Sequence, residues 1–503
     1  MSKVARSRRG MVVAAHPIAA EAGRAVLAEG GSAVEAAVAT CLTLGVVEPF
    51  ASGLGGGGYM LVHRAAATEF LDFRGVTPSI AEEPVVYPKG ATLPWQPKVG
   101  PSSATIPGQG RALDLALRRY GTGMPLARLA RPAIEAAEGG FDVSEVYGYV
   151  SGLFEGTLRS FPDAARIHLR DGRRRKAGDR LVQPDLARAL RRVAERGLED
   201  LYTGEIGRAI TATVNATGPV WGERDLERYE VKVRAPLVAR IGDAEIATMG
   251  PPSRGGAGIV RALRRWPAGG HNSPASIVGL GAAFREIFHA LEPLVGDPDV
   301  FPVDLAALTP PGHAPAAGSA STTHVTVVDG RGTWVAVSTT VGHFWGAGVV
   351  VPGWGILLND DISDAERGPG RRNSVGPSRR LVSNMAPTLV SRGGRPWFAV
   401  GTPGSLRIFP CLSQVIANVL FHGMDLERAV EAGRIHWEDE TLWLEGDIDP
   451  AVRARVGELW KGRIVERRAQ DLFFGGVHAA SLEADGTIVG VADPRRDGVA
   501  AAV

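Results

Sequence analysis

The sequence predicts a layered α+β protein in which helices cover β-sheets. Two observations favour this class: segments with helical periodicity occur through most of the chain, and the last third is dominated by short strand-like segments. We find no repeat array and no low-complexity tail. Helices and sheets that must each bury an apolar face are stable when packed against one another in layers.

The N-terminal part carries the clearest helical signals. Residues 21–29 have a helical pattern that a pair of glycines ends. Ser32 and Glu35 then form a capping box, which predicts a helix from residue 33 to about residue 44. This segment is apolar on nearly every side, so we expect it to be buried.

A glycine run at residues 53–58 precedes a strand-like segment. Nucleotide-binding loops place their glycines before a helix, so this order argues against such a loop and favours close backbone packing. Further along, the pattern predicts a strand at 69–74, a long helix at 111–137 and several short helices within 150–220.

The remaining elements follow from the same periodicities. Two strands are expected within 231–247, leading to a turn at 251–256, and a helix over 275–294. After a loop at 309–321 the chain becomes mainly β. The elements expected there are strands at 325–328, 333–340, 388–390 and 397–400, and helices at 408–420 and 426–432.

Composition excludes several classes of function. Lys plus Arg is 56 and Asp plus Glu is 54 among 503 residues, and this balance argues against a nucleic-acid or membrane-surface partner. The apolar run at 11–15 is too short for a signal-peptide core, and no stretch is long enough to span a membrane, so we expect a cytoplasmic protein. The two cysteines, Cys41 and Cys411, lack metal-ligand spacing and are expected to be buried thiols.

The segment Ser321-Thr322-Thr323-His324 lies where a loop rich in Pro, Gly and Ala meets a strand. Glycines at 330 and 332 give a turn, and the partner strand extends to Thr340. Thr322 is therefore either an ordinary strand threonine or a nucleophile that becomes N-terminal when the chain cuts itself.

Seven blocks in order resemble the γ-glutamyltransferase family of autoprocessing N-terminal-nucleophile hydrolases. They are the opening block at 14–38 and 52–61, followed by 71–74, 322–324, 346–360, 385–388, 401–404 and 492–498. The resemblance implies a four-layer αββα sandwich made from two fragments of one precursor, residues 1–321 and 322–503.

The resemblance also implies how the reaction is catalysed. Thr322 would first attack the Ser321–Thr322 peptide bond and then the substrate, with its own freed α-amine as general base. Thr340 matches the threonine that orients the nucleophile. Backbone N–H groups of Gly404 and Ser405 match the donors to the oxyanion. Because the family has a second glycine at the position of Ser405, a positive φ there would strain the serine.

Other matched positions concern substrate binding. Arg74 matches the arginine that binds a substrate carboxylate, and Asp364 matches a ligand of the substrate ammonium group. Gly342 and Asp361 stand where the family has Asn and Gln or Glu. The pair Ser383-Asn384 stands where it has two serines.

These departures suggest a remodelled site for the amino end of the substrate. Gly75 also replaces a family glutamate, and losing hydrogen bonds to a charged group costs about 1.5–3 kcal/mol each. The arginine-rich segment at 364–382 is either a solvated loop or part of the mouth of the site, where it would favour anionic substrates.

The function expected is that of an autoprocessing hydrolase or acyltransferase acting on a γ-glutamyl-like amide. One alternative is a specialised homologue of secondary metabolism, such as an antibiotic-biosynthesis enzyme that hydrolyses a C–C bond in alkylproline pathways, or a glutaryl- or oxamate-type amidase. Another is a scaffold without catalysis. We expect a small anionic substrate with a carboxylate, a heterodimer of the two fragments that could dimerise further, and no cofactor or metal.

Overall fold

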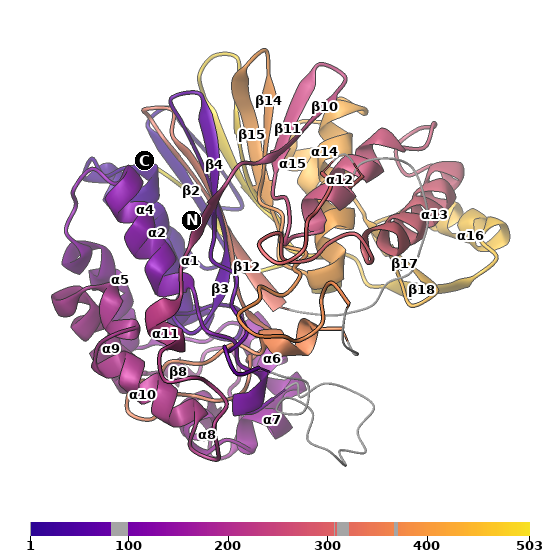
Figure 1. Ribbon diagram of the computed structural model, residues 1–503. Coiled ribbons are helices and arrows are strands. Elements are labelled where there is room, and N and C mark those ends of the chain that lie inside the picture. The colour runs from indigo at the N-terminus through magenta and orange to yellow at the C-terminus, as the bar shows by residue number, and fades with distance from the viewer. Residues whose placement is uncertain (1, 82–98, 306, 309–320, 367–370) are drawn as a thin grey trace.

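Two seven-stranded sheets lie face to face in the computed structural model, with helices on both outer sides (Figure 1). The structure describes residues 2–81, 99–305, 307–308, 321–366 and 371–503. Strand pairs within both sheets are antiparallel. This arrangement confirms the predicted αββα sandwich.

The first sheet contains the predicted hairpin near its centre. In spatial order its strands are β21 (Val499–Ala502), β2 (Gly10–Ala14), β12 (Ser321–Asp329), β13 (Trp334–Gly342), β3 (Gly57–Arg64), β4 (Ala67–Asp72) and β9 (Lys232–Arg234). The second sheet consists of β1 (Val4–Ser7), β20 (Ile488–Ala492), β19 (His478–Leu482), β15 (Arg395–Gly401), β14 (Thr388–Arg392), β11 (Ala244–Thr248) and β10 (Leu237–Ile241).

Each sheet combines strands from before and after residue 321. In the first sheet β12 pairs with β2, and β13 pairs with β3. In the second sheet β11 pairs with β14, and β1 pairs with β20. Neither half of the chain therefore contains all the strands of either seven-stranded sheet.

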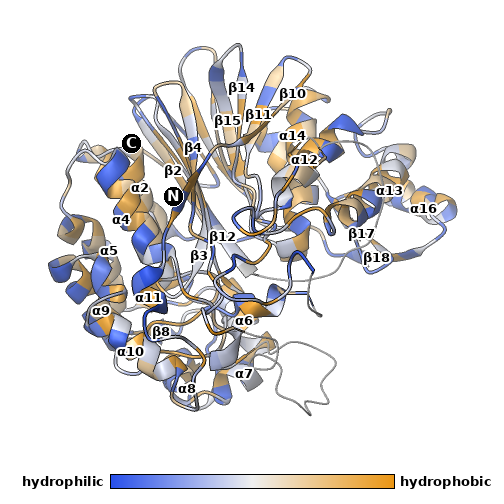
Figure 2. Cartoon of the chain, in the orientation of Figure 1, coloured by the Kyte–Doolittle hydropathy of each residue, from blue (hydrophilic) through white to orange (hydrophobic). Residues whose placement is uncertain are grey.

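The outer helices pack their apolar sides against the rest of the fold. One layer includes α1 (Pro17–Ala28), α2 (Ala33–Val47), α4 (Gln109–Tyr120), α5 (Leu126–Gly139) and α9 (Pro184–Arg196). The other includes α12 (Gly255–Arg264), α13 (Pro274–Leu291) and α14 (Ile408–Leu420). Figure 2 shows hydrophilic and hydrophobic sides on these helices, as in α9, where Leu186, Leu190 and Val193 are buried.

Smaller elements complete the periphery. They include the helices α6 (Glu145–Leu153), α7 (Glu155–Arg159), α8 (Pro162–His168), α10 (Glu205–Val214), α11 (Asp225–Arg228), α15 (Leu426–Glu431) and α16 (Pro450–Leu459). Four two-residue strands form two pairs, β5 (Phe141–Asp142) with β8 (Arg180–Leu181) and β6 (Leu169–Arg170) with β7 (Arg173–Arg174). A small third sheet contains β16 (Ile435–Glu438), β17 (Thr441–Glu445) and β18 (Arg463–Arg467).

Helix α2 begins with the predicted capping box and is buried along nearly all its length. The Ser32 N–H donates to Glu35 Oε2 at 2.7 Å, and the Glu35 N–H donates to Ser32 Oγ at 3.2 Å. Burial opposes ionisation of Glu35, but hydrogen bonds from Ser32, Thr122 and Met124 outweigh it and lower its pKa to about 2. The Ala33 N–H also donates to Asp329 Oδ2, which ties this helix to the β12–β13 hairpin.

The prediction of one helix over 111–137 is wrong. The structure has two helices, α4 and α5, because the chain turns between Gly121 and Pro125. Gly123 adopts φ +102° there, and Pro125 precedes the first residue of α5. By contrast, the helix at 408–420 has the predicted bounds, and Cys41 and Cys411 are buried and free as expected. Within the described ranges, no helix is long and apolar enough to cross a membrane.

Candidate active site at the β12–β13 junction

Thr322 is the second residue of β12, at the point where the hairpin register changes. Ser321 pairs with Gly342, whereas Thr323 pairs with Thr339, so two residues of β13, Thr340 and Val341, lie opposite Thr322. Such a bulge bends the strand locally and redirects its side chains. Thr322 is buried, with 3% of the residue exposed. The two threonines that the sequence assigns to catalysis are thus on adjacent strands at the bulge.

The backbone of Gly342 fixes the hydroxyl of Thr340. The Gly342 N–H donates to Thr340 Oγ1 at 2.9 Å. Gly342 has φ +93°, and a Cβ added there would lie 1.9 Å from Asp360 Oδ1. A side chain such as asparagine at residue 342 would therefore clash with Asp360, which occupies the space that it would need.

His324 is two residues further along β12 and is held between the sheets. Its Nδ1 and Nε2 atoms are hydrogen-bonded to Ser338 Oγ and Thr326 Oγ1 at 2.9 and 3.1 Å. Burial lowers the pKa of this imidazole well below its ordinary value, so it is held neutral. The ring packs on Gly401, where a Cβ would lie 2.1 Å from it.

Gly401 is the last residue of β15, and the Gly404–Ser405 turn follows directly. Gly404 has φ +137° and Ser405 has φ +58°, so the serine does occupy the left-handed region. Hydrogen bonds fix the two preceding residues, Thr402 and Pro403. The Thr402 hydroxyl donates to the Pro403 carbonyl at 2.9 Å and accepts from the Gly476 N–H at 2.9 Å. Because Gly401 contacts His324 of β12, the turn that follows Gly401 begins close to β12.

A substitution series at Ser405 tests whether the turn must keep its positive φ. Ser405→Gly should fold with a stability within about 1 kcal/mol of the unmutated protein, since relief of strain is offset by a more flexible unfolded chain. Ser405→Val should lose about 1–3 kcal/mol, because a β-branched residue is disfavoured in this region. Urea unfolding of both variants measures these changes. Equal stability of the two variants would contradict a fixed left-handed turn.

Arg74 lies two residues beyond β4 and is bonded to two aspartates. Its Nη1 contacts Asp361 Oδ1 at 2.6 Å, and its Nη2 contacts Asp364 Oδ2 at 2.7 Å. Its Nε lies 3.5 Å from the Leu381 carbonyl oxygen. Burial opposes the charge of Arg74, but the two aspartates outweigh it and raise the pKa of the guanidinium. Three residues assigned to the substrate site therefore form one ion-pair cluster.

Asp361 is the more buried of the two aspartates in this cluster. Burial raises its pKa to about 6, while Arg74 acts in the opposite direction. Gly75 lies against it, because a Cβ at Gly75 would be 1.9 Å from Thr105 Oγ1 and 2.7 Å from Asp361 Oδ2. The glutamate that the resemblance places at residue 75 could not fit beside these side chains.

Ser383 and Asn384 contact an arginine that the sequence patterns did not single out. Arg254, which precedes α12, donates its backbone N–H to the Ser383 carbonyl at 2.9 Å. Its Nε donates to Asn384 Oδ1 at 3.1 Å. The Ser383 hydroxyl accepts from the Met385 N–H at 3.1 Å. The only sequence signal was an arginine within the Pro-Pro-Ser-Arg-Gly-Gly turn.

The arginine-rich segment is partly structural. Arg380 is buried and lies 3.4 Å from Asp72 and 3.7 Å from Asp299. Arg372 donates to the Pro302 carbonyl at 3.0 Å. Arg367 lies outside the described residues. Arg380 is therefore not part of a solvated loop.

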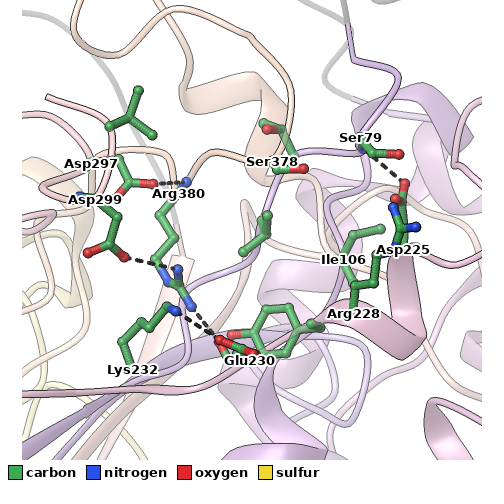
Figure 3. A pocket seen from close by; sticks show the side chains of 14 residues that line it. Ser79, Ile106, Asp225, Arg228, Glu230, Lys232, Asp297, Asp299, Ser378 and Arg380 are labelled. Carbon is green, nitrogen blue, oxygen red and sulfur yellow. Dashed lines mark hydrogen bonds and ion pairs between the residues drawn. The ribbon is translucent and has the colours of Figure 1, made fainter.

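A cavity of about 280 Å³ is lined by residues that include Glu230, Asp297 and Arg380 (Figure 3). Tyr229, one of its lining residues, donates its hydroxyl to the Arg74 carbonyl at 3.0 Å. Lys232 pairs with Glu230 at 2.9 Å, and Asp297 accepts the Arg380 N–H at 2.7 Å. None of the residues assigned to catalysis lines this cavity. In the part of the chain that the structure describes, no cluster of three or more His, Cys, Asp or Glu is suited to hold a metal ion.

Comparisons with known proteins agree on one family. The family model described as gamma-glutamyltranspeptidase matches residues 19–503. The chain is 34% identical to the Acylase ACY 1 proenzyme of Pseudomonas sp. strain SE83, covering all of this chain and 95% of that protein. It is 30% identical to the glutathione hydrolase proenzyme of Bacillus subtilis, covering 98% of this chain and 91% of that protein.

A solved structure supports the fold. The crystal structure of cephalosporin acylase from Bacillus halodurans superposes with a TM-score of 0.89 and covers 99% of this chain and 97% of that chain. At 23% sequence identity, this likeness concerns the architecture alone.

Proposed function

The chain belongs to the gamma-glutamyltranspeptidase family, and from this premise we propose that it is an autoprocessing N-terminal-threonine hydrolase or acyltransferase with Thr322 as nucleophile. The observation that carries the proposal is the register change that sets Thr322 opposite Thr340 and Val341 at the start of a central strand. Relatives described as proenzymes favour processing of this chain as well.

Processing begins with the hydroxyl of Thr322. Its Oγ1 attacks the carbonyl carbon of Ser321, and the C–N bond breaks as the nitrogen takes up a proton, leaving an ester. Water hydrolyses this ester and releases the carboxylate of Ser321 and the hydroxyl and α-amine of Thr322. The products are residues 1–321 and 322–503, which remain together as a heterodimer.

The same hydroxyl then attacks the substrate carbonyl, with the new α-amine as general base. Thr340, held by the Gly342 N–H, orients the nucleophile. The backbone N–H groups of Gly404 and Ser405 stabilise the oxyanion of the tetrahedral intermediate. Loss of the leaving amine gives an acyl-enzyme, and water or an acceptor amine then releases the acyl group.

The substrate we propose is a small amide with a carboxylate on its acyl group, and hydrolysis is favoured over transfer. Asp361, which pairs with Arg74, and the closed positions at Gly75 and Gly342 differ from the matched family pattern. A second candidate is an acylase-type activity on an acyl group that lacks an α-amine. The acylase relative and the altered ligands for that amine favour it.

Two measurements test the proposal. The purified protein should give two fragments on a denaturing gel, and N-terminal sequencing of the smaller fragment should start at Thr322. A single band under all conditions would refute the proposal. The processed protein should then be assayed with γ-glutamyl and glutaryl p-nitroanilides. Faster turnover of the γ-glutamyl compound would contradict the remodelled amino-end site.

A further inference from the structure

Arg254 is a buried guanidinium without a carboxylate partner among the described residues. It is 8% exposed, and its one side-chain hydrogen bond there joins Nε to the neutral amide oxygen of Asn384 at 3.1 Å. Three other deeply buried arginines of the chain behave differently, although Arg261 resembles Arg254 in bonding only neutral groups, the Leu308 and Ala307 carbonyls, among the described residues. Arg74, Arg434 and Arg495 each contact a carboxylate at 2.6–2.7 Å.

Such burial is costly unless something compensates for it. A charge removed from water loses several kcal/mol of solvation, which a contact partner normally offsets. Burial lowers the pKa of Arg254. The more distant carboxylates of Glu292, Glu366 and Asp364 raise this pKa and so offset part of the effect of burial. These acidic groups make the charge tolerable at this position without forming ion pairs with Arg254 in the described residues. Within the described ranges the terminal nitrogens of the side chain have no hydrogen-bonding partner, so they can bind another group.

The position of Arg254 connects it to the candidate active site. The segment from Leu381 to Asn384 contacts Arg74 at one end, through the Leu381 carbonyl, and Arg254 at the other, through Ser383 and Asn384. Three residues span at most about 11 Å of chain. Asp364, which binds Arg74, is also close enough to act on the charge of Arg254.

We propose that Arg254 binds the carboxylate at the far end of the substrate's acyl chain and thereby determines specificity, a task for which Arg74 is no longer free. This inference rests on the proposed function. Arg74 already has both terminal nitrogens bonded to aspartates, whereas Asn384 holds only the Nε edge of Arg254. A guanidinium oriented in this way can receive a carboxylate on two parallel N–H groups. The substrate class is a monoamide of a dicarboxylic acid with a chain such as glutaryl.

Kinetics with two matched substrates test the assignment. Glutaryl p-nitroanilide and pentanoyl p-nitroanilide differ only in the terminal carboxylate. Arg254→Gln should raise KM for the glutaryl compound about 10- to 150-fold, the range expected for losing a hydrogen bond to a charged group. It should change KM for the pentanoyl compound less than threefold. Arg254→Lys should retain part of the preference, and Arg228→Gln, which changes an exposed arginine, serves as the control.

Direct binding gives a second measurement that does not depend on turnover. Glutarate titrated into the unmutated protein should bind more tightly than pentanoate, and Arg254→Lys should weaken glutarate binding alone. Equal losses for both acids, or no loss for glutarate, would overturn the assignment. If the unmutated chain stays in one piece, the proposed function fails, and the glutarate titration still decides the role of Arg254. If Arg254→Gln does not fold, the comparison of Arg254→Lys with the unmutated protein decides it.

Discussion

Replacing Thr322 by alanine should leave the protein as one chain of 503 residues and remove its activity. The side chain lost is the proposed nucleophile of both reactions. Removing a catalytic nucleophile lowers kcat by about 10⁴-fold or more. A denaturing gel measures processing, and hydrolysis of the preferred anilide measures catalysis.

Thr322→Ser is the matched control because it keeps the hydroxyl and removes only a methyl group. This variant should still be cleaved and should retain measurable activity. Thr323→Ala changes the neighbouring hydroxyl and should also be cleaved. Cleavage of Thr322→Ala at the same bond, or loss of cleavage in both controls, would contradict the role of Thr322.

The second large effect is expected from Glu445 in β17. Glu445 accepts two hydrogen bonds from Arg495, at 2.7 and 2.6 Å, and both side chains are fully buried. Arg495 also contacts Asp493 at 3.1 Å, and Asp493 binds Arg434 at 2.7 Å. Glu445→Ala would leave Arg495 with one buried carboxylate instead of two. Removing one partner of a buried ion pair costs about 3–5 kcal/mol of unfolding free energy.

Urea unfolding of the purified protein measures this loss. Glu458→Ala provides the control, because the Glu458–Arg455 pair is exposed and should contribute less than about 1 kcal/mol. The cluster also supports the candidate oxyanion turn: Arg434 donates to the Phe474 carbonyl, and Gly476 donates to Thr402. Equal stability of the two variants would show that the buried network is not essential.

Local signals predicted much of the fold. The capping box of α2, the β12–β13 hairpin and helix α14 each depend on residues within a short window, and the structure has them at or near the predicted positions. Strand β2 could not be recognised in this way. Its five residues are paired with β12 and β21, so it exists because of partners more than 300 residues away.

For the candidate site too, some features could be predicted from the sequence and others could not. The family resemblance identified Thr322, Thr340 and Arg74, and their assigned roles stay predictions. It could not reveal that Arg74 is bonded to both aspartates, or that Arg254 lies against Asn384. These contacts join residues from 130 to 290 positions apart. A single sequence carries no periodicity that would report them.

The shared sheets have a consequence for how the processed protein unfolds. After cleavage before Thr322, β2 and β12 belong to different molecules, although they remain hydrogen-bonded neighbours. Refolding would then be a second-order reaction between two partial sheets, and the midpoint of thermal unfolding would rise with protein concentration. The precursor has no such dependence. Cleavage would therefore turn a chain that can refold by itself into two fragments. Their assembly would depend on having first folded as a single precursor chain.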